Sequence, residues 1–186
     1  MVEFRGQIDF AEPLPVGERI VFREWSDEDQ ETILSACRDS DIGAWTSMPE
    51  PSPETVETWI GQLPESKERG SALHLAIIDR GSDSIIGNAG FVGFDWKHSR
   101  AEVGYWILPE WREQGYATEA LRLVTKFAFS SLSVERVDLF VDPSNVGSKA
   151  VAEKAGYTYE GRLRSFRTYA GQRADLDLYS RLRTDH

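Results

Sequence analysis

The stretch from Arg100 to Ala128 constrains the fold more than any other part of the sequence. Over residues 100–108 the side chains alternate between two faces, which predicts a strand. A short loop containing Gly115 follows. Apolar residues then recur at helical spacing, at Ala117, Ala120, Leu121, Val124, Phe127 and Ala128. This order predicts a strand, a tight connection and a long amphipathic helix that packs against the sheet.

The remainder of the chain alternates in the same way and shows no internal repeat. We expect strands at 19–25, 73–78, 85–94, 136–141, 157–163 and 172–182. We expect helices after Ser26, from Ser52–Pro53 to about Leu63, and over 146–155. The pattern predicts an α/β (α+β) fold, a mixed sheet with helices on both faces, in a single domain 1–186 whose core covers about 19–183.

Charge and composition exclude several classes of protein. The chain has 31 acidic and 21 basic side chains, a net charge of −10, which disfavours nucleic-acid binding and favours a cationic partner. A single cysteine, Cys37, excludes an intramolecular disulfide and a cysteine-rich zinc site. No apolar stretch is long enough to span a membrane, and Met1–Phe10 lacks the apolar core of a secretory signal. We therefore expect a cytoplasmic protein that does not bind membranes. Five lysines against sixteen arginines fit either a salt-loving source or GC-rich codons.

The loop before the long helix is the clearest candidate for ligand binding. It reads Arg112-x-x-Gly115-x-Ala117, in which Gly115 permits a tight turn and Ala117 is small. The unpaired N–H groups at a helix start can bind a phosphate. The loop matches neither the nucleotide P-loop nor the dinucleotide pattern of glycines. Taken alone, it is typical of an ordinary junction between a strand and a helix.

Together with its surroundings, this loop resembles the pyrophosphate loop of the GNAT superfamily of acyl-CoA-dependent N-acetyltransferases, which reads Gln/Arg-x-x-Gly-x-Gly/Ala. Ala101-Glu-Val-Gly-Tyr-Trp-Ile107 precedes it, and Asn145-x-x-Ser148-x-x-Val151-x-Glu153-Lys154-x-Gly156-Tyr157 follows. The chain ends with Tyr169-x-Gly171-x-x-x-Asp175-x-x-x-Tyr179-Ser180. These blocks are similar to the RimJ/RimL-type branch of ribosomal-protein N-terminal acetyltransferases. The resemblance covers roughly Ile20 to Arg183 and implies a GNAT fold with a mostly antiparallel sheet.

The resemblance implies acetyl-CoA as co-substrate and no metal. Its pyrophosphate would lie on the backbone amides of Arg112–Thr118, and its pantetheine along Val103–Leu108, where a backbone N–H would stabilise the oxyanion. The implied cofactor-binding residues are Ile107, Leu108, Arg112, Glu113, Gln114, Gly115, Tyr116, Ala117, Thr118 and Asn145. Arg112 either contacts phosphate or is a solvated loop arginine.

The resemblance also implies the catalytic candidates Glu102, Ser148 and Asn145. Glu102 is the candidate general base, directly or through water, because partial burial would raise its pKa. Alternatively, it is a structural carboxylate or binds the substrate ammonium. Asn145 resembles the family asparagine that binds pantetheine or substrate; the alternative is a plain helix N-cap, and the two roles are compatible. The family's usual acid, a tyrosine, is replaced by Ala152. This leaves Ser148 as acid or as hydrogen-bond donor to the thiolate, against the alternative of a helix-surface serine.

Several other residues are candidates for the same site. Glu160 would orient Ser148 or receive the amine, or else form an ion pair with Arg162 or Arg164. The three histidines do not suggest a metal cluster, and His74 is expected in the core. Trp45 and Trp59 either belong to the core or line the acceptor site. Cys37 has no evident base beside it, which argues against a covalent acyl-enzyme.

We therefore expect an enzyme, an N-acetyltransferase that moves acetyl directly from acetyl-CoA to a primary amine. The acceptor would be a protein or peptide N-terminal α-amine. The alternatives are a small-molecule amine, such as an antibiotic or polyamine, and a non-catalytic acyl-CoA-binding regulatory domain. Another acyl group also stays open, and an edge strand near the C-terminus could support a homodimer.

Overall fold

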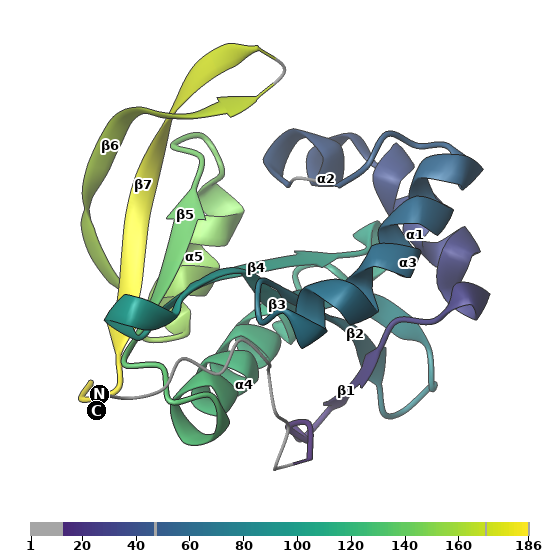
Figure 1. The fold of residues 1–186 in the computed structure, drawn as a ribbon, viewed down its shortest axis with the longest axis horizontal. Coiled ribbons are helices and arrows are strands. Elements are labelled where there is room, and N and C mark those ends of the chain that lie inside the picture. The colour runs from purple at the N-terminus through teal and green to yellow at the C-terminus, as the bar shows by residue number, and fades with distance from the viewer. Residues whose placement is uncertain (1–12, 47, 170, 186) are drawn as a thin grey trace.

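The computed structural model describes residues 13–46, 48–169 and 171–185 (Figure 1). The expectation for Met1–Phe10 lies outside these residues. The strands are β1 (Ile20–Glu24), β2 (Leu73–Asp79), β3 (Ile85–Asp95), β4 (Arg100–Ile107), β5 (Arg136–Val141), β6 (Thr158–Tyr169) and β7 (Gln172–Leu182). The helices are α1 (Gln30–Arg38), α2 (Ser40–Trp45), α3 (Pro53–Glu68), α4 (Tyr116–Ser131) and α5 (Val146–Lys154).

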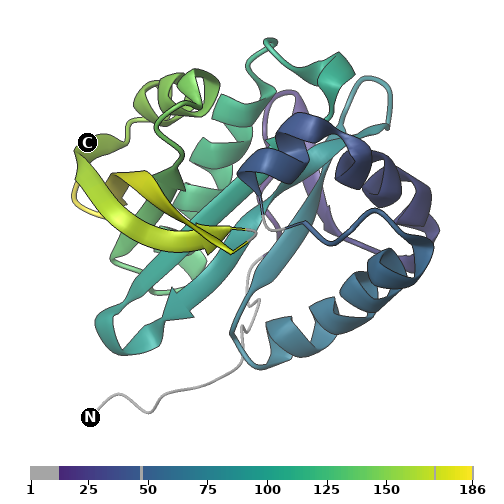
Figure 2. The same cartoon turned by 90° about the horizontal axis from the view of Figure 1, so that it is seen from above.

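The strands form one seven-stranded sheet in the order β1-β2-β3-β4-β5-β7-β6. Among the described strands, β4 and β5 pair in parallel and the other neighbours are antiparallel. The mixed, mostly antiparallel sheet flanked by helices is therefore confirmed. Helices lie on both of its faces, as Figure 2 shows.

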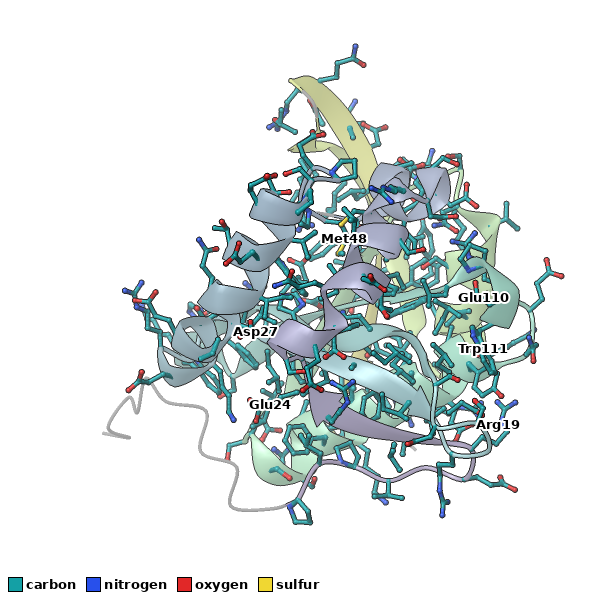
Figure 3. The ribbon with its side chains drawn as sticks, turned by 90° about the vertical axis from the view of Figure 1, so that its right-hand side faces the viewer. Arg19, Glu24, Asp27, Met48, Glu110 and Trp111 are labelled. Atoms are coloured by element: carbon teal, nitrogen blue, oxygen red, sulfur yellow. The ribbon has the colours of Figure 1, made fainter. Side chains whose placement is uncertain are left out.

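Each face of the sheet carries its own hydrophobic core, because alternate residues of a strand point to opposite sides. One core joins α4 and α5 to Leu75, Phe91 and Val103. The other joins α1, α2 and α3 to Ala76 and Trp106. Figure 3 shows the side of the molecule on which Met48 and Trp111 lie. The prediction that the strand at 73–78 is buried on both faces is confirmed, except at His74.

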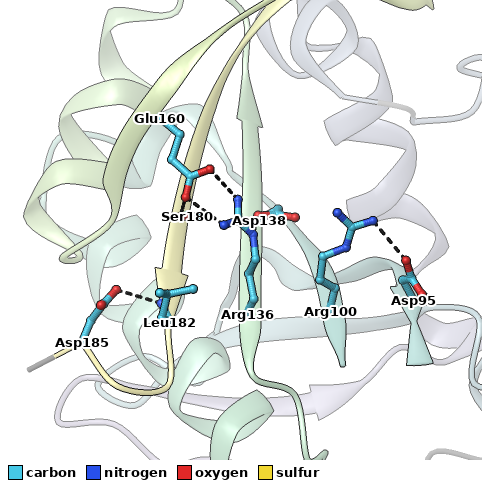
Figure 4. A network of polar contacts seen from close by, with 8 residues as sticks. All are labelled: Asp95, Arg100, Arg136, Asp138, Glu160, Ser180, Leu182 and Asp185. Atoms are coloured by element: carbon cyan, nitrogen blue, oxygen red, sulfur yellow. Dashed lines mark hydrogen bonds and ion pairs between the residues drawn. The ribbon is translucent and has the colours of Figure 1, made fainter. Parts of the chain in front are cut away.

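The pairing of β4 with β5 is short, and this shapes the molecule. It covers only Arg100–Glu102 opposite Arg136–Asp138, after which the two strands diverge. Arg136 fixes the closed end, since its guanidinium donates to Asp138 at 2.6 Å and to both oxygens of Glu160 at 2.8 and 2.7 Å (Figure 4). The diverging strands therefore open from an ion-paired junction.

Two elements run further than the sequence indicates. The α3 helix continues past Leu63 to Glu68, although Pro64 cannot donate the usual backbone hydrogen bond. Its last turn is held by the Lys67–Glu24 ion pair at 2.5 Å. The β6 strand continues past Leu163 to Tyr169, because β7 pairs with this polar stretch as well. Neither extension has an apolar periodicity that would reveal it.

In the part of the chain that the structure describes, no helix has both the length and the apolar character needed to cross a membrane.

Candidate functional site

A cleft of about 630 Å³ lies where β4 and β5 diverge. It is lined by residues 102–107 of β4, residues 139–141 of β5, the first residues of α4 and α5, and side chains from α2, α3 and β2. One continuous space therefore joins the helix start predicted to bind phosphate to the predicted catalytic residues. Glu102, Asn145 and Ser148 all line it, as expected.

The N-terminus of α4 has no side-chain cap. Gly115 caps the helix with a φ of +85°, a left-handed conformation, and provides no side-chain hydrogen bond to the helix start. The N–H groups of Tyr116, Ala117 and Thr118 are therefore those that a helix leaves unpaired. Tyr116 anchors this turn, since its hydroxyl donates to Asp79 at 2.9 Å. These features fit the phosphates of a nucleotide co-substrate.

Most of the predicted cofactor-binding residues line the cleft, with two exceptions. Leu108 is 7% exposed and packs in the second core. Gln114 turns back to donate to the Glu110 carbonyl at 3.1 Å, while its own carbonyl accepts from Arg19 at 2.8 Å. Neither residue is among those that line the cleft.

The Arg112 side chain links two segments of the chain through hydrogen bonds and is not a solvated loop residue. Its guanidinium donates to Asp39 at 2.6 Å, to Asp41 at 2.9 Å and to the Ile107 carbonyl at 3.0 Å. It therefore joins the loop before α4 to the start of α2. A phosphate could reach this side chain only in competition with two carboxylates.

Glu102 is held by an arginine that sequence reasoning missed. Arg167 of β6 donates to both carboxylate oxygens of Glu102 at 2.9 Å each. Arg167 also lies over the rings of Phe140 and Phe166, at 5.2 and 5.8 Å from their centres. The pair brings β6 to the cleft and stabilises Glu102 in a fixed orientation. Arg167 lies in the polar stretch of β6, where no motif marks it.

Ser148 is paired with a second residue that sequence reasoning did not assign to catalysis. Its hydroxyl lies 2.9 Å from the Tyr105 hydroxyl, within hydrogen-bond distance. Burial raises the pKa of Tyr105 to about 12, so it stays protonated at neutral pH. The Asn145 side chain accepts from the Ser148 N–H at 2.9 Å and caps α5, which confirms the N-cap interpretation. Ala152 is fully buried and lies in the core.

The opposite face of β4 is lined by aromatic residues. Trp45 and Trp59 line the cleft, and so does His74. The expectation that His74 is a core residue is wrong, because its ring is only partly buried and forms part of the cleft wall. Burial lowers the pKa of His74 to about 4, so the imidazole is neutral at physiological pH.

Glu160 does not take part in this site. It pairs with Arg136, accepts a hydrogen bond from Ser180, and is not among the residues that line the cleft. The pKa of its carboxyl is lowered, first by the hydrogen bond from Arg136. The expected pairs with Arg162 or Arg164 are replaced by this one, because Arg162 binds Asp177 at 2.8 Å. Glu160 thus belongs to the junction in Figure 4.

Cys37 is buried on α1, and burial raises the pKa of its thiol. A thiol in this state is a poor nucleophile. Among residues 13–46, 48–169 and 171–185, no group of three or more His, Cys, Asp or Glu side chains is placed to hold a metal ion.

Comparison with known proteins identifies the type of domain. A family model described as an acetyltransferase (GNAT) domain matches residues 19–158. The uncharacterized N-acetyltransferase YoaA of Bacillus subtilis is 28% identical over 173 residues, which cover 90% of this chain and 96% of that protein.

Solved structures share the fold. RimL, a ribosomal L7/L12 alpha-N-protein acetyltransferase crystallised with coenzyme A, superposes with a TM-score of 0.80 at 19% identity, covering 92% of this chain and 98% of that one. The microcin C7 self-immunity acetyltransferase MccE, crystallised with acetyl-CoA and AMP, also gives a TM-score of 0.80, at 22% identity and with coverage of 92% and 97%.

Proposed function

Because this chain belongs to the GNAT family of N-acetyltransferases, we propose that it transfers acetyl from acetyl-CoA directly to the N-terminal α-amine of a protein or peptide. The observation that carries the proposal is the continuous cleft between the diverging strands β4 and β5. This cleft connects an uncapped helix start to polar groups on the two faces of β4. Direct transfer needs both reactants to be held together in one space.

The residues at the α4 end suit the phosphates of acetyl-CoA. The N–H groups of Tyr116, Ala117 and Thr118 would hold the pyrophosphate, since Gly115 leaves them uncapped. Acetyl-CoA supplies the acetyl group in an activated form, as a thioester. The edge of β4 that faces β5 offers backbone groups beside the place where the thioester oxygen gains charge.

Glu102 and Ser148 have complementary roles in this proposal. Glu102 lies on one face of β4. Tyr105 lies on the other face of β4, and its hydroxyl contacts the hydroxyl of Ser148. Glu102 takes the proton of the acceptor ammonium, directly or through water, and Arg167 holds the carboxylate in place. Ser148 donates a hydrogen bond to the departing sulfur, and the Tyr105 hydroxyl donates a hydrogen bond to the serine oxygen.

The test measures free thiol released from acetyl-CoA with three classes of acceptor: N-terminal peptides, polyamines and aminoglycosides. We expect release with peptides. Glu102→Gln and Ser148→Ala should lose turnover and still bind acetyl-CoA, while Glu65→Gln, which alters an exposed carboxylate of α3 outside the cleft, serves as the control. Release with polyamines or aminoglycosides alone would replace the peptide acceptor by a small molecule. Binding of acetyl-CoA without turnover in any class would indicate a regulatory domain.

The exposed strand β6 ends the sheet, and we propose that it supports a homodimer. Tyr159 and Phe166 are large apolar side chains on this strand, 50% and 43% exposed. Sedimentation analysis of the wild type and of a Tyr159→Lys variant would test this, since a monomeric wild type would contradict the proposal.

A further inference from the structure

One row of residues across the sheet forms a floor near Glu102 in which two glycines carry no side chain. His74 of β2 pairs with Gly90 of β3, and Gly90 pairs with Gly104 of β4. Directly paired residues point to the same face, so these three share the face of Glu102. Neither glycine contributes a side chain, because the Leu73 carbonyl blocks the Cβ position of Gly90 and a Val92 methyl carbon lies 3.0 Å from that of Gly104. The row therefore separates His74 from Gly104, which is two residues from Glu102 on β4, by two strand spacings, roughly 10 Å.

Two polar side chains on this face have hydrogen-bonding groups that no described residue pairs with. Among the described residues, the His74 ring has no hydrogen-bond partner, although it is partly buried. Asn88 is 4% exposed, and its side-chain oxygen accepts from the Trp25 indole at 2.9 Å. Its NH₂ group has no partner within the same described part of the chain. Both residues line the cleft. No buried side-chain N or O atom of the described residues lacks a partner, so these unpaired groups are accessible from the cleft and available to a ligand.

Aromatic side chains form the cleft wall above this floor, and their rings pack against one another. The Trp59 ring lies 5.3 Å from the His74 ring and 6.4 Å from Trp25, edge-on in both cases. Trp25 in turn stacks on Trp106 at 5.9 Å. Trp45 is 38% exposed beside the same cleft. This rigid surface suits an apolar or aromatic group, which can bury its area without reorganising the protein.

The charges on this side do not suit a polycation. Glu102 is paired with Arg167, and Asp41 is paired with Arg112. A second ammonium group bound to either of these two carboxylates would have to compete with the arginine already paired to it. His74 is neutral, so it adds no charge to this side and can accept a hydrogen bond from a backbone N–H of the acceptor.

We propose that the acceptor is an α-amine whose own residue carries an apolar or aromatic side chain, bound between His74, Asn88 and Trp59. This inference rests on the proposed function and adds the class of first residue. The amine lies beside Glu102, and the NH₂ of Asn88 donates to the carbonyl of the first residue. The imidazole of His74 accepts a hydrogen bond from a backbone N–H further along the peptide. The side chain of that residue packs against Trp59 and Trp45. A side-chain ε-amine has no adjacent carbonyl for Asn88.

The experiment uses peptides that differ only in the first residue, which is Phe, Leu, Gly, Lys or Glu, and follows thiol release at saturating acetyl-CoA. In the wild type, kcat/KM for the Phe and Leu peptides should exceed that for Lys and Glu by roughly tenfold or more. His74→Ala should raise KM for the Phe peptide about tenfold with a smaller change in kcat. His74→Gln, which keeps a hydrogen-bond acceptor, should restore part of the loss.

His98→Ala is the matched control, since His98 is an exposed imidazole paired with Asp95, and its kinetics should equal the wild type. Acetyl-CoA binding by each variant shows that it is folded. A wild type that acetylates every peptide equally well, or prefers Lys, overturns this inference and leaves the proposed function intact. A wild type that acetylates no peptide overturns the proposed function itself. If His74→Ala does not fold, the wild-type preference alone decides.

Discussion

Two glycine-to-alanine substitutions should change stability in opposite directions. Gly115 has a φ of +85°, where a side chain is disfavoured by about 1–2 kcal/mol, while the added Cβ would meet only Arg19 at an ordinary 3.4 Å. Since alanine also restricts the unfolded chain, we expect Gly115→Ala to lower the free energy of unfolding by about 1 kcal/mol. Gly61 lies inside α3 with no atom within 4 Å of its Cβ position. Gly61→Ala should therefore raise the free energy of unfolding by nearly 1 kcal/mol.

For a chain of this length, 1 kcal/mol corresponds to about 2–4 °C in Tm. The two variants should thus differ by about 4–8 °C in calorimetry, with the wild type between them. Urea unfolding at 25 °C gives the same order independently. If both substitutions moved Tm in the same direction by similar amounts, the left-handed conformation would not be what requires glycine at position 115.

Three further outcomes are expected at the site. Ser148→Ala should lower kcat about 100-fold with little change in acetyl-CoA affinity, and Tyr105→Phe should lower kcat less, both measured by thiol release. Asn145→Ala removes the cap of α5 and should lower Tm by about 2–4 °C, whereas Asn145→Asp, which keeps an acceptor, should not; calorimetry decides. The pKa of His74 is lowered to about 4 from 6.5, so the unfolded chain binds its proton more readily. The free energy of unfolding should then fall by at most about 3 kcal/mol as pH drops from 6.5 to 4. Above pH 6.5, His74 should not affect the free energy of unfolding. In urea titrations at different pH values, His74→Gln should no longer show this part of the pH dependence.

The parts of the fold that depend on local pattern were predictable. Alternation over 100–108 and the apolar stripe from Ala117 to Ala128 gave β4 and α4, and with them the face on which each side chain lies. The placement of Glu102, Asn145 and Ser148 in one cleft came from the resemblance, since their distance in sequence gives no indication of contact.

What escaped prediction depends on partners brought from elsewhere in the chain. Arg167 reaches Glu102 only because β6 extends as a polar strand over the cleft. His74 lies in an apolar run that predicts burial on both faces, and it becomes part of the cleft wall because glycines occupy the neighbouring positions of the sheet. Arg112 binds Asp39 and Asp41 of a helix start that has no marked periodicity. Each of these is a tertiary contact without a local signal.

The three-residue pairing between β4 and β5 also affects how the sheet behaves as a whole. Beyond Glu102, the edge of β4 that faces β5 forms no strand pairing within the described residues, so its amides depend on water or on a ligand. An extended co-substrate lying in the gap would act as an additional strand and join the two parts of the sheet. Amide hydrogen exchange along Val103–Ile107 should then slow when acetyl-CoA binds. The bound co-substrate would also form one wall of the site for the acceptor.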